Sequence, residues 1–219
     1  MALLEVRSLC KSFRGLRAVH EVSFDVPAGA IVALIGPNGA GKTTCFNLIA
    51  GVFRADSGSV ILDGRRLDGL RPDQVCHAGV GRTFQLVKPF AQLSVEENVV
   101  VGALKATGDV NKARVSAGEI LALLGLAPKR NQLAASLTLP ERKRLEVARA
   151  MATRPRLLLL DEVMAGLRPT ETDQMVEVFR RLNRETGLTI LLIEHVMRAV
   201  MALAQRIVVL HHGETICQG

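Results

Sequence analysis

A glycine-rich stretch near residue 40 holds residue types that bind phosphate. The segment reads GPNGAGKTT, and its last glycine comes directly before Lys42 and Thr43. Glycines let the backbone turn so that successive N–H groups point at phosphate oxygens, and a following helix adds the positive end of its dipole. In this pattern the lysine reaches the outer phosphates of a nucleotide, and the threonine hydroxyl binds Mg²⁺. The sequence therefore predicts a P-loop that binds ATP with Mg²⁺, formed by Gly36, Pro37, Asn38, Gly39, Ala40, Gly41, Lys42, Thr43 and Thr44.

Acidic and basic side chains follow two later apolar segments. Residues 157–160 are all leucine and lead into Asp161 and Glu162, and the apolar residues 191–193 are separated from His195 by one glutamate. Ligands of open α/β sheets bind beyond the carboxyl ends of the strands. We therefore expect Asp161 to hold Mg²⁺ through water, Glu162 to be the general base for the attacking water, and His195 to contact the γ-phosphate. The sequence assigns no role to the remaining histidines, which are His20, His77, His211 and His212.

The elements that must position these residues alternate between strands and helices. The first thirty residues alternate apolar and polar side chains, which predicts short antiparallel strands. The later strands are expected at residues 30–35, 58–62 (ending in an Asp63-Gly64 turn), 156–160, 188–193 and 206–210, and helices at residues 45–50, 170–184 and 195–203. Strands that alternate with helices of this length favour a parallel sheet.

The middle third of the chain is predicted to be a helical insertion. Its pattern is helical from residue 94 to about 135, and it starts at Ser94 with the spacing of a capping box. We expect one domain, in which residues 91–154 form a helical subdomain and residues 1–90 and 155–219 form the nucleotide-binding core. The predicted fold class is α/β: a P-loop NTPase with a mostly parallel core sheet, an N-terminal antiparallel β subdomain and an inserted α-helical subdomain.

Composition narrows the class of protein. Of 219 residues, 48% are hydrophobic and 22% charged, which is a globular balance. No apolar run approaches the ~20 residues that span a bilayer. The net charge of +7 favours anionic neighbours: nucleotide, nucleic acid or an anionic membrane surface. The basic residues are scattered without aromatic residues between them, and basic charge alone does not select among these partners. No nucleic-acid partner is expected. The four cysteines lack metal-ligand spacing and are expected to be reduced thiols; alkylation of Cys45, just past the P-loop, could block nucleotide binding.

The order of these motifs resembles that of the ATP-binding cassette (ABC) ATPases over nearly the whole chain. Four segments are similar to the ATPase subunit of branched-chain amino acid uptake systems: 81–99 (GRTFQLVKPFAQLSVEENV), 142–162 (RKRLEVARAMATRPRLLLLDE), 165–171 (AGLRPTE) and 191–197 (LLIEHVM). The resemblance implies an ATP-hydrolysing importer subunit for branched-chain or related amino acids, at the cytoplasmic face of the cell membrane and soluble when isolated. Its partners would be membrane-spanning permease subunits, a second ATPase chain and, indirectly, a periplasmic or extracellular substrate-binding protein.

The same resemblance implies roles for individual residues. Phe13 would stack on adenine, although packing within a strand is the alternative. Gln85 would bind Mg²⁺ and sense the attacking water, and so would join Lys42, Glu162 and His195 in catalysis. A groove for a cytoplasmic helix of the permease would be lined by four apolar residues, for which core packing is the alternative: Phe84, Leu86, Val87 and Phe90.

The segment that should complete a second nucleotide site departs from the family. ABC ATPases sandwich two ATP molecules, each between one chain's P-loop and the other chain's signature, Leu-Ser-Gly-Gly-Gln; residues 137–141 here read Leu-Thr-Leu-Pro-Glu. Thr138 keeps the hydroxyl that would contact nucleotide. Leu139 and Pro140 replace glycines, and Pro140 removes an N–H donor. Glu141 adds a carboxylate. Because losing a hydrogen bond to a charged group costs about 1.5–3 kcal/mol, we expect the partner ATPase to be a non-identical chain with a consensus signature.

Two other functions remain open from the sequence. One is an ABC-type ATPase that acts on nucleic acid or the ribosome, although the sequence carries neither a long coiled-coil insertion nor a second cassette. The other is a nucleotide-dependent regulatory module with little hydrolysis, which the altered signature would allow. Family members usually continue past residues 213–215, whereas this sequence stops at Gly219, so dimer contacts from a C-terminal segment are expected to be missing.

Overall fold

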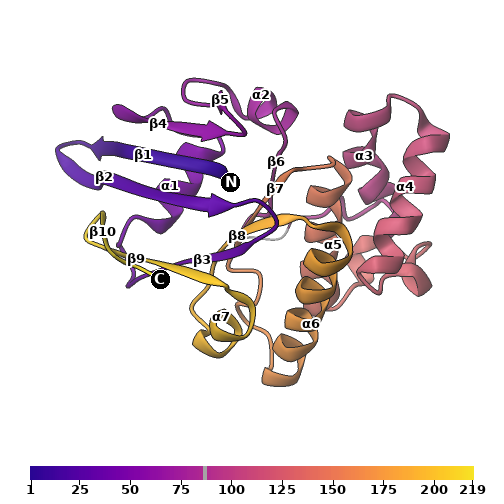
Figure 1. Ribbon diagram of the computed structural model, residues 1–219. Coiled ribbons are helices and arrows are strands. Elements are labelled where there is room, and N and C mark those ends of the chain that lie inside the picture. Colours follow the sequence, from indigo (N-terminus) through magenta and orange to yellow (C-terminus); the bar gives the residue numbers. More distant parts are fainter. Residues whose placement is uncertain (86–87) are drawn as a thin grey trace.

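Two β-sheets form the framework of the computed structural model, which describes residues 1–85 and 88–219. The strands are β1 (Ala2–Phe13), β2 (Leu16–Pro27), β3 (Ile31–Ile35), β4 (Ser57–Leu62), β5 (Arg65–Arg66), β6 (Val80–Arg82), β7 (Leu157–Asp161), β8 (Thr189–Ile193), β9 (Arg206–His211) and β10 (Glu214–Gln218). The helices are α1 (Lys42–Ile49), α2 (Pro72–His77), α3 (Val95–Thr107), α4 (Val110–Leu123), α5 (Leu139–Ala152), α6 (Pro169–Thr186) and α7 (Met197–Leu203), with the 3₁₀ turns η1 (Ala127–Lys129) and η2 (Ala134–Ser136). Figure 1 shows α3 and α4 at the right of the molecule, opposite the tip of the β1–β2 hairpin at the left.

The first sheet is antiparallel, with strand order β2-β1-β4-β5. The strands β1 and β2 are 12 residues each, which makes them longer than the short strands expected from the sequence. Their apolar residues pair across the hairpin, as Val6 does with Phe24 and Leu9 with Val22, and this continuous buried face lets the ladder extend. The expected turn between β4 and β5 is confirmed, because Asp63 and Gly64 both have positive φ, as a tight two-residue hairpin requires.

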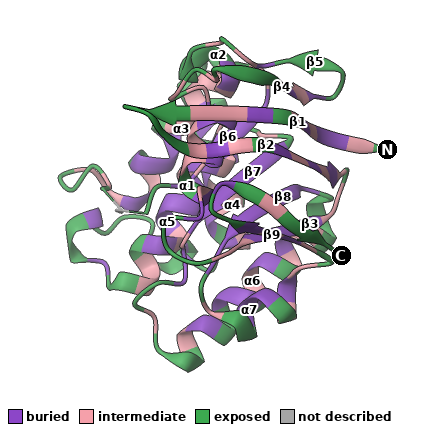
Figure 2. Ribbon diagram, turned by 90° about the vertical axis from the view of Figure 1, so that its left-hand side faces the viewer, coloured by how far each residue is buried: buried purple, intermediate pink, exposed green. Residues whose placement is uncertain are grey.

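The second sheet has the order β10-β9-β3-β8-β7-β6 and is parallel except at β10. Every residue of β7 and β8 is buried, which is the pattern of strands covered on both faces. Figure 2 shows this burial in the centre of the molecule. Because β3, β7, β8 and β9 run the same way, the residues after their carboxyl ends meet at one edge of the sheet. The predicted α/β fold class is confirmed, and that shared edge is where the chemistry must lie.

Side chains of β7 alternate between two hydrophobic cores, as the period of a strand demands. Leu157 and Leu159 pack in the core that contains the antiparallel sheet and α1, whereas Leu158 and Leu160 pack in the core that contains α3 to α7. β7, the strand next to the edge strand β6, is thereby fixed from both faces. Its carboxyl end, at Asp161, is correspondingly well fixed in position.

The helices of residues 95–152 form a unit in which α3, α4 and α5 contact one another. The capping box expected at Ser94 is confirmed: its Oγ accepts from the Glu97 N–H at 3.1 Å, and its own N–H donates to Glu97 at 2.7 Å. In contrast, α7 begins at Met197, later than expected, because Val196 has an extended backbone. Among the described residues, no helix has the length and apolar character to cross a bilayer.

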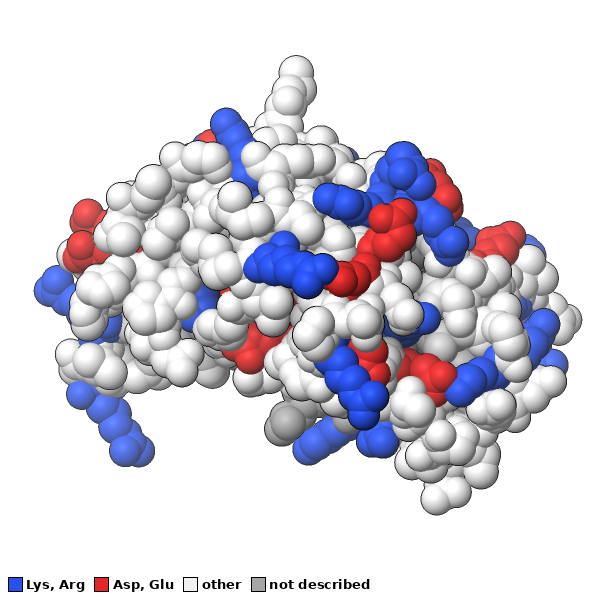
Figure 3. Space-filling model, turned by 90° about the horizontal axis from the view of Figure 1, so that it is seen from below, with Lys and Arg blue, Asp and Glu red and all other residues white. Residues whose placement is uncertain are grey.

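Charged side chains of both signs are interspersed on the face seen from below in Figure 3. Pairs of opposite charge link neighbouring helices, as Arg198 of α7 and Asp173 of α6 do at 2.6 Å. The net charge of +7 is therefore not gathered into one basic surface on that face.

Candidate active site

The P-loop owes its shape to glycines that no larger residue could replace. Gly41, directly before α1, has φ +97°, and a Cβ there would lie 2.4 Å from the Ala18 carbonyl oxygen. A Cβ on Gly36 would lie 2.1 Å from the Leu210 carbonyl oxygen. Both distances are far inside van der Waals contact, so the loop closes tightly between β2 and β9. It leads into the amino end of α1, where backbone N–H groups and the helix dipole favour anions.

Lys42 places its ammonium at this loop. Nζ donates to the carbonyl oxygens of Gly36 and Pro37 at 2.8 and 2.9 Å. Burial lowers the pKa of Lys42, while the carboxylates of Glu162 and Asp161 act in the opposite direction. A positive charge is thus held beside the loop and faces the two acidic residues.

A hollow of about 680 Å³ opens over the P-loop. Its lining comes from the start of β2, from the loop and from the ends of β7, β8 and β9: Leu16, Arg17, Ala18, Asn38, Gly39, Ala40, Gly41, Lys42, Thr43, Thr44, Glu162, His195 and His212. The P-loop from Asn38 to Thr44, with the basic residue Lys42, belongs to this lining, which suits a polyphosphate. The geometry therefore fits the phosphates of ATP.

Glu162 brings the predicted catalytic residues together. Its carboxylate accepts a hydrogen bond from Nε2 of His195 at 2.8 Å and another from Nε2 of Gln85 at 2.7 Å. The three residues follow the ends of separate strands: Glu162 follows β7, His195 follows β8 and Gln85 follows β6. A carboxylate held between an imidazole and an amide at the mouth of a phosphate site can orient and deprotonate a water.

The three predicted metal ligands line one adjoining hollow of about 560 Å³: Thr43, Gln85 and Asp161. Asp161 is buried, and burial raises its pKa, whereas Nη2 of Arg82 at 3.1 Å favours the charged form. A hydroxyl, an amide and a carboxylate supply the oxygen ligands that Mg²⁺ prefers, so the residues fit the ion.

Sequence reasoning missed two residues at this edge. His212 lines the P-loop hollow just after β9, and the N–H of Gly213 donates to the Ala40 carbonyl at 3.1 Å, which ties this hairpin to the loop. The strand-end rule that selected His195 would also have selected His212. Arg82 was missed because its two partners, Asn47 and Asp161, lie in distant segments.

Four predicted nucleotide contacts do not line the hollow: Phe13, Gly36, Pro37 and Thr138. Gly36 and Pro37 lie outside its lining, and their carbonyl oxygens accept from Nζ of Lys42. The Phe13 ring lies 5.2 Å from the Phe53 ring, edge to face, at the tip of the β1–β2 hairpin. Thr138 precedes α5, and its N–H donates to the Glu141 carboxylate at 2.9 Å. The contacts of Phe13 and Thr138 with nucleotide therefore stay predictions, and only that of Thr138 requires a second ATPase chain.

One of the four thiols lies near the P-loop. Cys45 is buried in α1, and burial raises the pKa of its thiol to about 12. Since the thiolate is the reactive form, Cys45 is protected from alkylation in the folded protein. Alkylation of Cys45 is therefore disfavoured in the folded protein, and its effect on nucleotide binding stays a prediction.

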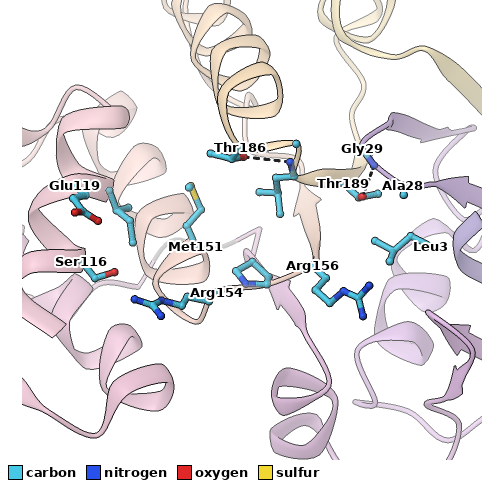
Figure 4. Close-up of a pocket in the computed structure, with 14 residues that line it drawn as sticks. Leu3, Ala28, Gly29, Ser116, Glu119, Met151, Arg154, Arg156, Thr186 and Thr189 are labelled. Carbon is cyan, nitrogen blue, oxygen red and sulfur yellow. Dashed lines mark hydrogen bonds between the residues drawn. The ribbon is translucent and has the colours of Figure 1, made fainter. Parts of the chain in front are cut away.

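A third hollow, of about 500 Å³, lies at the opposite ends of the core strands (Figure 4). Its lining includes Leu3, Gly29 and Thr189, and the Gly29 N–H donates to the Thr189 hydroxyl at 2.8 Å. Figure 4 shows its two arginines, Arg154 and Arg156, extending in opposite directions. They do not converge on one point as an anion site requires, so the chemistry concentrates at the P-loop edge.

The parallel sheet, the P-loop and the acidic strand end define a P-loop ATPase. The chain belongs to the ABC transporter family, whose model matches residues 19–165. It is 40% identical to the high-affinity branched-chain amino acid transport ATP-binding protein LivG of Salmonella typhimurium, over 99% of this chain and 91% of LivG. It is 34% identical to the lipopolysaccharide export system ATP-binding protein LptB of Escherichia coli, over 100% and 91% respectively. A crystal structure of a nucleotide-free ATP-binding cassette from an ABC transporter matches with a TM-score of 0.91 at 28% identity, covering 100% of this chain and 91% of that one.

Proposed function

We propose that this chain is the ATPase subunit of an importer for branched-chain or related amino acids. The proposed ATPase activity is supported by the Glu162 carboxylate, which is hydrogen-bonded to His195 and Gln85 at the phosphate hollow. The substrate class is inferred from LivG, which is 40% identical to this chain, whereas LptB is 34% identical at similar coverage. The site would lie at the cytoplasmic face of the membrane, where a transporter meets ATP.

In this proposal the residues at the strand edge bind the phosphates and activate the attacking water. Lys42 and the P-loop N–H groups bind the β- and γ-phosphates. Glu162 accepts a proton from the attacking water, and His195 holds both that carboxylate and the γ-phosphate. Phe13 would cover the adenine ring from the hairpin tip; the residue is 37% exposed, with its ring edge to face against Phe53.

Mg²⁺ would be held by Thr43, Asp161 and Gln85, the first two close to the phosphates and the third on the loop after β6. When bound, the ion would neutralise charge on the β- and γ-phosphates. Gln85 touches Glu162 as well, so one amide would respond both to the ion and to the base. This double contact suits a residue that links the site to the loop beyond it.

We also propose that membrane-spanning permease subunits dock in a groove of about 300 Å³ between α2, β6, α3 and α5. Apolar side chains at its rim are exposed: Val52, Phe84, Phe90 and Val101. Exposed apolar surface of this kind favours a partner. Leu86 and Val87, which were also expected to line the groove, lie outside the described residues. A substrate-binding protein would reach this chain only through the permease.

The second ATPase chain is proposed to be non-identical and to carry a consensus signature. This chain's P-loop, Glu162 and His195 would serve a competent site with the partner's signature, while Thr138 and its neighbours complete a weaker one. The helical subdomain of residues 91–154 would carry that signature toward the partner, and residues 1–90 and 155–219 would form the core.

Co-purification with a tag on this chain tests the proposal. Mass spectrometry should find permease subunits and a second ATPase, and proteoliposomes of the complex should import labelled leucine only when ATP is enclosed on the side of the ATPases. Glu162→Gln is the matched inactive control. Transport of an unrelated substrate would refute the substrate class alone, and ATP hydrolysis stimulated by nucleic acid would favour the rival function.

Turnover at the two sites separates a motor from a regulatory module. The catalytic glutamate is replaced in one chain at a time. Replacing Glu162 should abolish most hydrolysis by the complex, whereas replacing the corresponding glutamate of the partner ATPase should not. Equal losses would refute the asymmetric pair. Slow turnover by the whole complex, despite a partner with a consensus signature, would favour a regulatory module.

A further inference from the structure

The loop after β7 holds Glu162 in a conformation that its surroundings must maintain. Glu162 has φ +49°, in the left-handed region that residues with a Cβ rarely adopt. A strained backbone of this kind persists only where neighbouring contacts fix it. The groups that contact this loop are therefore candidates for positioning the catalytic carboxylate.

One contact comes from Lys143 on α5. Its Nζ donates to the backbone carbonyl of Glu162, with an N–O distance of 3.2 Å. Lys143 is 5% exposed, and burial lowers its pKa against the pull of nearby carboxylates, chiefly that of Glu194. A buried ammonium is costly unless it is hydrogen-bonded. Among the described residues, the Glu162 carbonyl is the acceptor that Lys143 reaches.

A second contact comes from Glu194 at the end of β8. Its Oε1 accepts a hydrogen bond from the N–H of Met164 at 2.8 Å, two residues beyond Glu162. The N–H of Glu162 itself donates to the Ile193 carbonyl at 3.0 Å. The loop is thus fastened to β8 at two points and to α5 at a third. Both charged side chains that do this are buried, and neither touches the phosphate hollow.

We propose that Lys143 and Glu194 are positioning residues for hydrolysis. They hold the backbone of residues 162–164 so that the Glu162 carboxylate keeps its two hydrogen bonds. This inference rests on the proposed role of Glu162 as general base. Because α5 begins directly after Thr138, Lys143 also ties this chain's signature to its own catalytic loop.

The rival explanation is that Lys143 only fastens the helical subdomain to the sheet. Kinetics of the co-purified complex separate the two. Lys143→Met, which removes the donor, should lower kcat roughly ten- to hundredfold while KM for ATP changes less than about twofold, because misplaced catalytic groups affect chemistry more than binding. Lys143→Arg keeps a donor and should stay within about threefold of the parent kcat. A fall in kcat that is the same for both variants would overturn the proposal.

A double substitution identifies the route of the effect. In a Glu162→Gln background, the residual hydrolysis belongs to the other site, so adding Lys143→Met should leave it unchanged. A further loss there would mean that Lys143 acts through the signature, which would overturn the positioning role. If Glu162→Gln alone retains full activity, the proposed catalytic role fails instead, which distinguishes the two failures.

Substitutions of Glu194 test the proposal independently if the Lys143→Met variant fails to fold. Glu194→Gln keeps an oxygen acceptor for the Met164 N–H and should retain most of kcat, whereas Glu194→Ala leaves that N–H without its acceptor and should lower kcat roughly tenfold at unchanged KM. Equal activity of these two variants would overturn the role of Glu194.

Discussion

Arg82 joins the end of β7 to the edge strand β6, and replacing it with methionine should destabilise the fold substantially. Its Nη1 donates to Asn47 at 2.6 Å, and its Nη2 donates to Asp161 at 3.1 Å. The Arg82 and Asp161 side chains are only 10% and 3% exposed. Removing one partner of a buried pair leaves an unpaired charge and costs about 3–5 kcal/mol. The Arg82→Met variant should therefore unfold far more easily than the parent.

Thermal unfolding without nucleotide measures this loss. In a chain of this size 1 kcal/mol corresponds to about 2–4 °C, so Tm should fall by roughly 6–20 °C. Arg66→Met is the matched control: Arg66 also pairs with an aspartate, Asp68 at 2.8 Å, but its side chain is 67% exposed, so its loss should move Tm much less.

The reasoning would be refuted if the Arg82 and Arg66 variants lost similar stability. A second test follows, because most of the stability lost in Arg82→Met comes from the unpaired charge left on Asp161. Adding Asp161→Asn should therefore recover part of the lost Tm. A double variant less stable than Arg82→Met alone would show that the buried charge is not the cause.

Three further outcomes are expected. Glu162→Gln should lower ATP hydrolysis, measured by phosphate release, about 10²–10⁴-fold, and sustained hydrolysis would contradict the role of general base. The Tm of this variant should be unchanged or raised, because the substitution removes one of several neighbouring acidic charges. Gly36→Ala should weaken binding of a fluorescent ATP analogue more than about tenfold, since its Cβ would meet the Leu210 carbonyl at 2.1 Å. Burial raises the pKa of Glu194 from 4.5 to about 7, so between these values the folded protein keeps a proton that the unfolded chain releases. Relative to Glu194→Gln, the parent should therefore lose roughly 3 kcal/mol of stability as pH rises from 4.5 to 7, measured by urea unfolding, and a difference independent of pH would refute the shift.

The sequence was sufficient to predict the strand-edge residues because their signals are local. An apolar strand that ends in a polar residue marks Asp161, and the glycine spacing before Lys42 marks the P-loop. Both signals follow from the needs of a buried parallel strand and of a phosphate cradle. Boundaries were less certain, as the late start of α7 illustrates, because helix ends depend on tertiary contacts.

The contacts that connect these residues could not be predicted in the same way. The bonds from Glu162 to His195 and Gln85 join positions 33 and 77 residues apart, and the bond from Lys143 to the Glu162 carbonyl requires a helix to cross the end of a strand. No local pattern encodes such a distance. The sequence assigns no role to Arg82, because its partner Asp161 lies 79 residues away.

The geometry of the signature segment changes how its departure from the family should be understood. Glu141 would bring an opposing charge to a phosphate, but its carboxylate accepts from the Thr138 N–H and pairs with Lys129 at 2.5 Å. That charge is therefore already partly neutralised, and it serves the start of α5. The bulk of Leu139 and the missing N–H of Pro140 have no such compensation among the described residues. If this chain's signature supports a weaker site, the cause lies in the backbone of residues 139–140 and only secondarily in the carboxylate.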